Sequence, residues 1–350
     1  MAFLTGDALA RLIAPVVREV CGDGVVRVTS MPGGASLRRY HRVDVAGGRP
    51  ESIVVMETGD PQHSDEVVKS AKIVELPFLN VQRYLAKGGV PVPAVYRYDQ
   101  PNGLVYLEDL GDVTFESRVQ GPDEETRRRY YRLAIDELVK MQKYSTLEQD
   151  SSCIAFGRGF DYDLLKWELD HFREFGIEAQ GISLSATEQT ELDRHFHTIA
   201  EKLAAAPRGF VHRDFQSRNL MVQDGAQGPR LRVIDFQDAL LGTAAYDLVG
   251  LLRDSYVALS PSLLEELVRY HVGRAELDER SFTELFHLQT VQRKLKDAGR
   301  FVFIERVKKI PGFMQHIPSS LGYVAHAMSK LPELAPLREL LSRHFAPFRT

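Results

Sequence analysis

The chain has 350 residues, of which 44% are hydrophobic and 26% are charged, and its formal net charge is -4. This balance is typical of a globular protein, and the length allows either one large domain or two lobes that share a cleft. The absence of a basic excess argues against a protein that binds nucleic acid without regard to its sequence.

The cysteines and the N-terminus bear on the compartment. Cys21 and Cys153 lack the spacing of metal ligands, which argues against both a zinc site and a disulfide framework. The first residues lack the charged start and apolar core of a signal peptide, and no stretch approaches the roughly 18 consecutive apolar residues of a membrane span. We therefore expect a cytoplasmic protein with no membrane partner and no obligate protein partner.

Residues 1–107 are expected to form a small α+β lobe. Residues 5–20 carry apolar side chains at helical spacing and predict an amphipathic helix. A helix is also expected over residues 65–87, restarted at Pro77, which cannot lie in a helix interior without breaking it. Short β-prone runs separated by Gly- and Pro-containing turns predict strands at 25–30, 38–45, 53–56, 92–98 and 104–107.

After residues 108–112, which we expect to form a hinge, the sequence is mostly helical as far as residue 350. Periodic apolar patterns predict helices at 122–145, 161–175, 185–205, 262–274, 281–307 and 332–345. Short apolar runs at 210–212, 220–222 and 231–234 predict a compact β insertion. We expect a group of basic residues to form the solvated face of a helix, namely Lys294, Lys296, Arg300, Arg306, Lys308 and Lys309.

The β insertion carries residues suited to phosphoryl transfer. His212 begins a His-Arg-Asp sequence that ends at Asp214, Asn219 lies five residues later, and Asp235 follows the next apolar run. Transfer of a γ-phosphoryl group needs a carboxylate that orients the attacking hydroxyl and oxygen ligands that hold Mg²⁺ against the phosphates. Each residue alone is more simply a turn, capping or loop-supporting group. Together, and in this order, they predict an enzyme that uses ATP and Mg²⁺.

Three segments resemble the signature of the aminoglycoside phosphotransferase and choline kinase superfamily. They are residues 210–222, residues 233–239 and the sequence Ala-Tyr-Asp-Leu at 245–248. The resemblance extends over most of the chain and implies a bilobal, protein-kinase-like fold of class α+β, with a β-rich N-terminal lobe and a helical C-terminal lobe at 113–350.

One branch of that superfamily is especially similar. The sequence Ala-Ser-Leu-Arg-Arg-Tyr at 35–40, the run from 235 to 254 and Gln-Arg-Lys-Leu-Lys at 292–296 resemble the anomeric kinases of bacterial cell-wall recycling. Those enzymes phosphorylate N-acetylmuramate and N-acetylglucosamine at C1. The resemblance therefore implies a sugar kinase with a small-molecule amino-sugar substrate.

The resemblance also implies roles for individual residues. Asp214 would be the catalytic base, while Asn219 and Asp235 would bind Mg²⁺. His212 is assigned to orienting the loop, and Asp247 would be a structural acceptor that ties the catalytic loop to the following helix. The hinge whose backbone meets adenine would consist of Glu108, Asp109 and Leu110.

One departure from the wider superfamily concerns the phosphates. Kinases of this fold usually carry a Lys on the third strand, paired with a helix Glu. Here that strand has Met56 and no Lys, as is familiar in the sugar-kinase branch, so we expect Arg38 or Arg39 to supply the positive charge. The preceding turn could approach phosphate or could be only a hairpin turn, and its candidate ligands are Gly33, Gly34 and Ser36.

The substrate-side candidates are Arg218, Asp238, Glu168 and His171. Glu168 and His171 lie on the expected helix at 161–175, where this fold inserts acceptor-binding helices. Asp238 could either support its loop or contact the substrate, and Arg218 could reach a substrate carboxylate. The only tryptophan, Trp167, is expected to pack in the core in preference to stacking on a sugar.

Three functions remain open at this point. The first is the anomeric amino-sugar kinase, and the second is a kinase of the same fold that acts on an aminoglycoside, choline or homoserine. The third is a pseudokinase that binds nucleotide or a protein. The helical part lacks the dense acidic clustering that a polycationic aminoglycoside would require. Retention of the base with both metal ligands argues against the pseudokinase.

Overall fold

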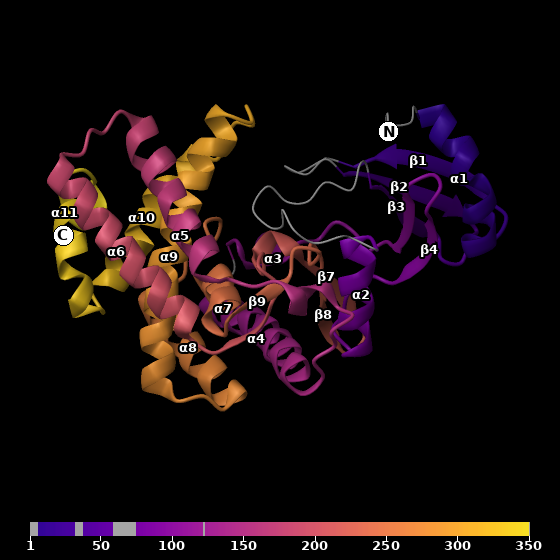
Figure 1. Ribbon diagram of the computed structural model, residues 1–350. Helices are drawn as coiled ribbons and strands as arrows, with labels where there is room; N and C mark the ends of the chain where they lie inside the picture. The colour runs from indigo at the N-terminus through magenta and orange to yellow at the C-terminus, as the bar shows by residue number, and fades with distance from the viewer. Residues whose placement is uncertain (1–5, 32–37, 59–74, 122, 350) are drawn as a thin grey trace.

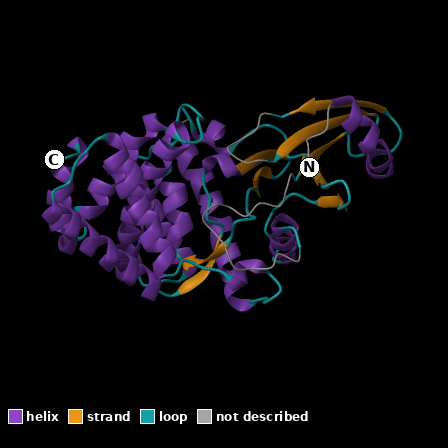
Figure 2. Cartoon of the chain, turned by 45° about the horizontal axis from the view of Figure 1, so that its top comes forward, coloured by secondary structure: helices purple, strands orange, loops and turns teal. Residues whose placement is uncertain are grey.

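The computed structural model describes residues 6–31, 38–58, 75–121 and 123–349. Within these residues the chain forms two lobes (Figure 1). The strands of the large sheet gather in the N-terminal lobe, whereas helices fill the C-terminal lobe (Figure 2). The predicted α+β bilobal class is confirmed.

The N-terminal lobe is built on an antiparallel sheet with the strand order β1-β2-β3-β5-β4. Helix α1 (Gly6–Cys21) packs its apolar side chains, including Leu9 and Ile13, against this sheet. The strands lie close to the predicted positions: β1 Val25–Ser30, β2 Arg39–Ala46, β3 Ser52–Glu57, β4 Val95–Asp99 and β5 Leu104–Glu108. The last of them ends where the hinge was expected to begin.

Strand β3 is the strand on which related kinases carry a Lys. Met56 is buried there, opposite Tyr40 on β2 and Val105 on β5. Helix α2 (Pro77–Lys87) begins at Pro77, as predicted. The earlier part of the expected helix, residues 65–74, lies outside the described residues.

Five helices of the C-terminal lobe begin after an Asp or Ser residue whose side chain caps them. Asp123, Asp161, Ser185, Ser260 and Asp278 each accept a backbone N–H from the third residue that follows. The helices are α3 Phe115–Val119, α4 Glu124–Leu147, α5 Tyr162–His171, α6 Ala186–Ala205, α7 Ala245–Leu252, α8 Pro261–Ala275, α9 Glu279–Arg306, α10 Ile317–Met328 and α11 Ala335–Ser342. The sequence pattern missed α3 and α10, and it anticipated α7 only as the helix that Asp247 ties to the catalytic loop.

The β insertion consists of two short antiparallel pairs. Strand β6 (Arg208–Val211) pairs with β9 (Leu240–Thr243), which was not predicted, and β7 (Leu220–Gly225) pairs with β8 (Gly228–Val233). Strands β7, β8 and β9 lie between the large sheet and the helical bundle (Figure 1). The loops that join them are therefore held near the place where the lobes meet.

The prediction of a solvated basic face on α9 is wrong for two of the six residues. Lys294 and Lys296 are only 2% and 9% exposed, whereas Arg306, Lys308 and Lys309 are exposed as predicted. The reason is that α9 packs against α5, α7 and α10, so the middle of the helix, where Lys294 and Lys296 lie, is mostly buried. The Asp297 carboxylate balances the buried charge, with an oxygen 2.8 Å from the Lys294 ammonium.

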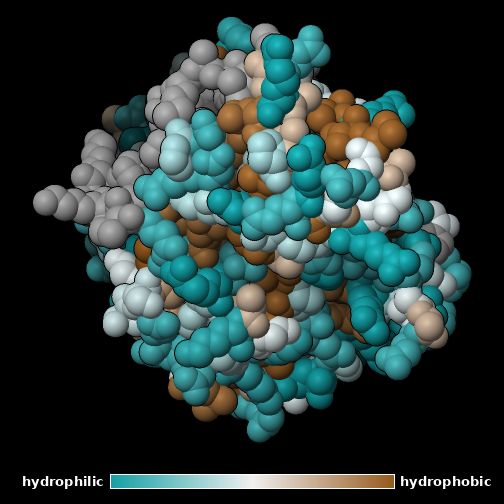
Figure 3. Space-filling view, turned by 90° about the vertical axis from the view of Figure 1, so that its right-hand side faces the viewer, coloured by the Kyte–Doolittle hydropathy of each residue, from teal (hydrophilic) through white to brown (hydrophobic). Residues whose placement is uncertain are grey.

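The distribution of polar and apolar side chains is visible on one face of the molecule (Figure 3). On the face seen in Figure 3, hydrophilic residues cover most of the surface and hydrophobic residues occur in separate small groups. No helix in the described part of the chain is both long enough and apolar enough to cross a bilayer. Cys21 and Cys153 are both buried and form no disulfide.

Two leucines of α4 test the location of the core. Leu138 is fully buried and Leu147, on the same helix, is 81% exposed. Leu138→Ala should lower the free energy of unfolding by about 2–5 kcal/mol, because it leaves a cavity. Leu147→Ala should change it by less than about 0.5 kcal/mol. Urea denaturation measures both, and equal losses would contradict this packing.

Candidate active site

The catalytic loop runs from His212 to Asn219, between β6 and β7, and ends in a 3₁₀ turn. The Asn219 amide donates to the backbone carbonyl of Asp214 at 2.9 Å. The same amide nitrogen lies 3.4 Å from a carboxylate oxygen of Asp235, which follows β8. The structure thus brings together the three residues that the sequence singled out as base and metal ligands.

His212 joins the two loops of the site. Its Nε2 donates to the carbonyl of Ile234 at 2.9 Å, and its Nδ1 accepts the backbone N–H of Asp214 at 3.2 Å. Burial lowers the pKa of the imidazole, which favours the neutral form that this pairing requires. Both ring nitrogens are engaged, so His212 orients the loop and is not placed to transfer a proton.

Two buried aspartates hold the catalytic loop from behind. Asp247, in α7, accepts the backbone N–H groups of His212 at 2.6 Å and Arg213 at 3.0 Å. Asp254, two residues after the end of α7, accepts the backbone N–H of Ser217 at 2.9 Å. Sequence reasoning anticipated Asp247 but gave Asp254 no role, although an acidic residue so close to the end of the apolar run of α7 was a usable signal.

Both loops contain a residue with unusual backbone geometry. Arg213 has φ 79° and Asp235 has φ 66°, a region that residues other than glycine rarely occupy. Such conformations persist only where the surroundings impose them, and they concentrate at functional sites. At Arg213 the surroundings include Asp247 and, 3.8 Å from its guanidinium, a carboxylate oxygen of Glu168.

The Asp235 loop is rich in oxygen ligands. The Gln237 amide donates to Asp235 at 2.8 Å, while its own Oε1 is buried and has no hydrogen-bond partner among the described residues. Two effects raise the pKa of Asp235. Burial is the larger, and the negative charge of Asp214 is the second. Nearby carboxylates with an amide oxygen suit a hard cation such as Mg²⁺, which uses one or two carboxylates together with substrate phosphates. The residues present therefore fit this metal.

Sequence reasoning missed one residue that shapes this loop. Arg158 donates to the carbonyls of Ala239 and Gln237 at 2.9 and 2.6 Å. It thereby fixes the backbone directly after Asp235. No local motif marks Arg158, because its partners lie far along the chain.

From the N-terminal lobe, Arg38 reaches the site. Its guanidinium lies 3.9 Å from a carboxylate oxygen of Asp235, whereas Arg39 is exposed at the start of β2. The other predicted phosphate-side residues, Gly33, Gly34 and Ser36, lie outside the described residues.

The acidic side chains of the expected hinge are already engaged. Glu108 pairs with Arg232 of β8 at 2.7 Å, and Asp109 pairs with Arg42 of β2 at 2.7 Å. Leu110 is buried. This segment would therefore recognise a ligand mainly through its backbone N–H and C=O groups.

Two of the substrate-side candidates lie on the loops of the site. Asp238 is half-buried and accepts a hydrogen bond from Gln237 at 3.3 Å. The Arg218 guanidinium pairs with Glu116 at 2.7 Å and lies 3.4 Å from the centre of the Tyr256 ring. Both remain predicted substrate contacts.

The other two candidates are buried behind the catalytic loop. Glu168 is fully buried and accepts the Gln292 amide at 2.6 Å, and the His171 ring packs on the rings of Trp167 and Phe175. Their burial does not favour direct contact with a substrate. The expectation that Trp167 lies in the core is wrong, since it is 41% exposed at the edge of this aromatic group.

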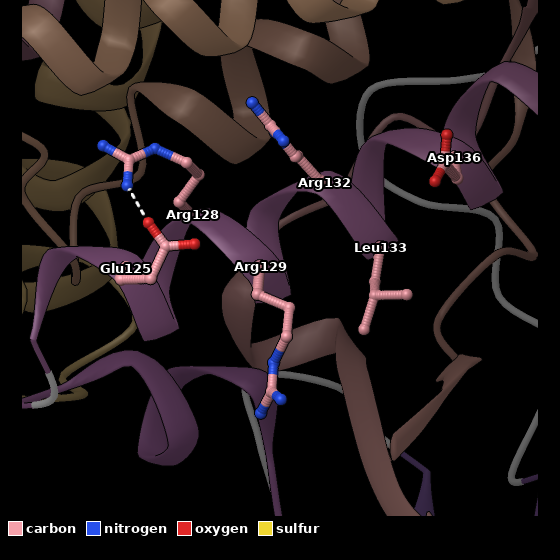
Figure 4. Close-up of a pocket in the computed structure, with 6 residues that line it drawn as sticks. All are labelled: Glu125, Arg128, Arg129, Arg132, Leu133 and Asp136. Atoms are coloured by element: carbon pink, nitrogen blue, oxygen red, sulfur yellow. Dashed lines mark hydrogen bonds and ion pairs between the residues drawn. The ribbon is translucent and has the colours of Figure 1, made fainter. Parts of the chain in front are cut away.

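A separate hollow lies on α4 (Figure 4). It has a volume of about 210 Å³ and is lined by Glu125, Arg128, Arg129, Arg132, Leu133 and Asp136. Arg128 and Arg132 are both paired with Glu266 of α8. None of the predicted site residues lines this hollow, which is a charged surface feature apart from the catalytic loop.

Comparison with known proteins identifies the class. The phosphotransferase enzyme family (APH) matches residues 27–280, which include the catalytic loop and the Asp235 loop. The chain belongs to this family and is therefore a phosphotransferase. The resemblance inferred from the motifs is confirmed.

Individual relatives are similar over most of their length. An N-acetylmuramate/N-acetylglucosamine kinase of Neisseria meningitidis is 31% identical over 325 residues, covering 90% of this chain and 89% of the relative. A kinase of the same name from Pseudomonas putida is 28% identical over 323 residues, covering 90% and 87%. The crystal structure of choline kinase LicA from Streptococcus pneumoniae superposes with a TM-score of 0.60 at 13% identity, covering 91% and 99%, and thus shares the fold.

The two hydrogen bonds to Asp247 can be tested by an isosteric change. Asp247→Asn replaces one acceptor oxygen with an NH₂ group, which cannot accept a hydrogen bond. The side chain can then accept the backbone N–H of His212 or that of Arg213, but not both. We expect the free energy of unfolding to fall by about 1–3 kcal/mol, the cost of leaving a buried donor unsatisfied. Asp163→Asn, at an exposed position of α5, is the control and should change little. If urea denaturation finds the two variants equally stable, Asp247 does not hold the loop.

Proposed function

We propose that this phosphotransferase moves the γ-phosphoryl group of ATP, with Mg²⁺, to the anomeric C1 hydroxyl of N-acetylmuramate, N-acetylglucosamine or both. The observation that carries the chemistry is the convergence of Asp214, Asn219 and Asp235 on two adjoining loops. The acceptor is supported by the shared name of curated relatives that match about nine-tenths of the chain. The reaction would return amino sugars to metabolism in the cytoplasm during cell-wall recycling.

Asp214 is the residue placed to act as base. Its carboxylate is 41% exposed, and its backbone is fixed on both sides by His212 and Asn219. A carboxylate so held can accept a hydrogen bond from the sugar hydroxyl, align the attacking oxygen with the phosphorus and take its proton. Alignment of this kind supplies much of the catalysis in phosphoryl transfer.

Asn219 and Asp235 are the residues that would hold Mg²⁺. When bound, the metal neutralises negative charge on the phosphates. Arg38 would add a second positive charge from the N-terminal lobe, in place of the Lys that β3 lacks. The backbone of Glu108, Asp109 and Leu110 is the proposed contact for adenine.

The acceptor can be tested by measuring ADP release from ATP with N-acetylmuramate, N-acetylglucosamine, choline, homoserine and an aminoglycoside. We expect turnover with one or both amino sugars. The methyl glycoside of N-acetylglucosamine should be inert, because its C1 oxygen is blocked. Turnover of the methyl glycoside, or turnover only with choline, homoserine or the aminoglycoside, would contradict the proposal.

The Asp214→Asn variant is the catalytic control for this assay. It keeps the size of the side chain but removes the base, so kcat should fall by about 10²–10⁴-fold, the usual contribution of a general base. ADP should still bind, since the variant leaves Asn219 and Asp235 intact. Activity close to that of the parent protein would exclude Asp214 as the base.

The neighbouring arginines offer a matched pair for the phosphate contact. Arg38→Ala should raise the KM for ATP by about 10-fold, equivalent to about 1.4 kcal/mol, because a cation near the phosphates is lost. Arg39→Ala removes an exposed arginine next to it and should change the KM by less than about twofold. Initial rates at varied ATP concentration measure both KM values. Identical values for the two variants would contradict a contact between Arg38 and the phosphates.

A further inference from the structure

An arginine from α9 faces the proposed base. The Arg293 guanidinium lies 3.8 Å from a carboxylate oxygen of Asp214. Within the described part of the chain, no other charged side chain is paired with this carboxylate. Arg293 lies beyond residue 280, where the family match ends. The contact is therefore made by a segment outside residues 27–280, although residues 292–296 resemble the amino-sugar kinase branch.

The guanidinium is held firmly against α7. It donates to the carbonyl of Tyr246 at 3.3 Å and lies 4.4 Å from the centre of the Tyr246 ring. Gly250, one turn further along α7, leaves the necessary space. A Cβ at that position would lie 3.0 Å from a guanidinium nitrogen and 3.1 Å from its carbon, which is closer than Cβ contacts normally are.

Arg293 keeps its charge in the interior. It is 3% exposed, and although burial opposes its charge, the surrounding Tyr246, Asp297 and Asp214 raise its pKa. A buried guanidinium is costly unless its charge is balanced by neighbours. One of the balancing groups here is the half-exposed carboxylate that would meet the substrate.

We propose that Arg293 is a positioning residue, which holds the Asp214 carboxylate in the orientation that the attacking hydroxyl requires. Among the described residues this carboxylate makes the ion pair with Arg293 and no side-chain hydrogen bond, so the ion pair is the contact that restricts its rotation. Misplacing a reacting group by about 1 Å can cost about 10²-fold in rate. This inference rests on the proposed role of Asp214 as base.

The test compares Arg293→Met, Arg293→Lys and the control Arg280→Met, which removes a 90% exposed arginine from the same helix. Each variant is assayed with the acceptor that the parent protein phosphorylates, and its melting temperature and its affinity for ADP are measured. Arg293→Met should lower kcat by about 100-fold while both KM values stay within about threefold. Arg293→Lys should recover at least tenfold of that loss, because it restores a positive charge, and Arg280→Met should behave like the parent.

The outcomes separate positioning from simple structural support. A kcat of Arg293→Met within twofold of the parent would overturn the inference. An equal loss of kcat in both Arg293 variants, with weaker ADP binding and a lower melting temperature, would also overturn it. That result would show that Arg293 only stabilises the packing of α9 against α7. If the parent phosphorylates none of the amino sugars, the proposed acceptor fails, and the comparison is made with whichever acceptor it does phosphorylate.

Discussion

The carboxylate of Asp247 accepts two consecutive backbone N–H groups, those of His212 and Arg213, in the interior of the C-terminal lobe. Arg213 adopts a left-handed backbone conformation between these bonds, and the Asp214 side chain that follows is 41% exposed. His212 then links the loop to Ile234, the residue before Asp235. The placement of the proposed base relative to the Asp235 loop therefore depends on one buried acidic side chain in α7.

A second constraint is charge. Burial raises the pKa of Asp235, and the nearby negative charge of Asp214 raises it further. Cations approach from both sides, with Arg38 near Asp235 and Arg293 near Asp214. Under the proposed function this negative charge would attract Mg²⁺, and the two arginines limit the electrostatic cost of the site without the metal.

Sequence alone predicted features that depend on local patterns. Strand β1 coincides with its predicted residues, and α2 begins at Pro77, because β-propensity and proline act on the local backbone. The catalytic triplet was recognisable for a similar reason, since its members lie close together in the chain. Its metal and nucleotide roles remain proposals that the structure supports through proximity.

Features that depend on distant packing were not predictable. Lys294 and Lys296 were predicted to be solvated because the sequence does not reveal that other helices surround α9. Strand β9 has only four residues and exists through its pairing with β6, which lies far from it in sequence. Arg158 and Arg293 reach the site from other segments, so no spacing rule could place them there.

The most direct test of the account is the structure of the reaction product, determined by ³¹P and ¹H NMR after incubation of the protein with ATP, Mg²⁺ and N-acetylglucosamine or N-acetylmuramate. The account predicts a phosphate whose phosphorus couples to the anomeric proton, H1, of the sugar. A phosphate that couples instead to the protons at C6, or ADP formation without any phosphorylated sugar, would contradict the proposed transfer to C1.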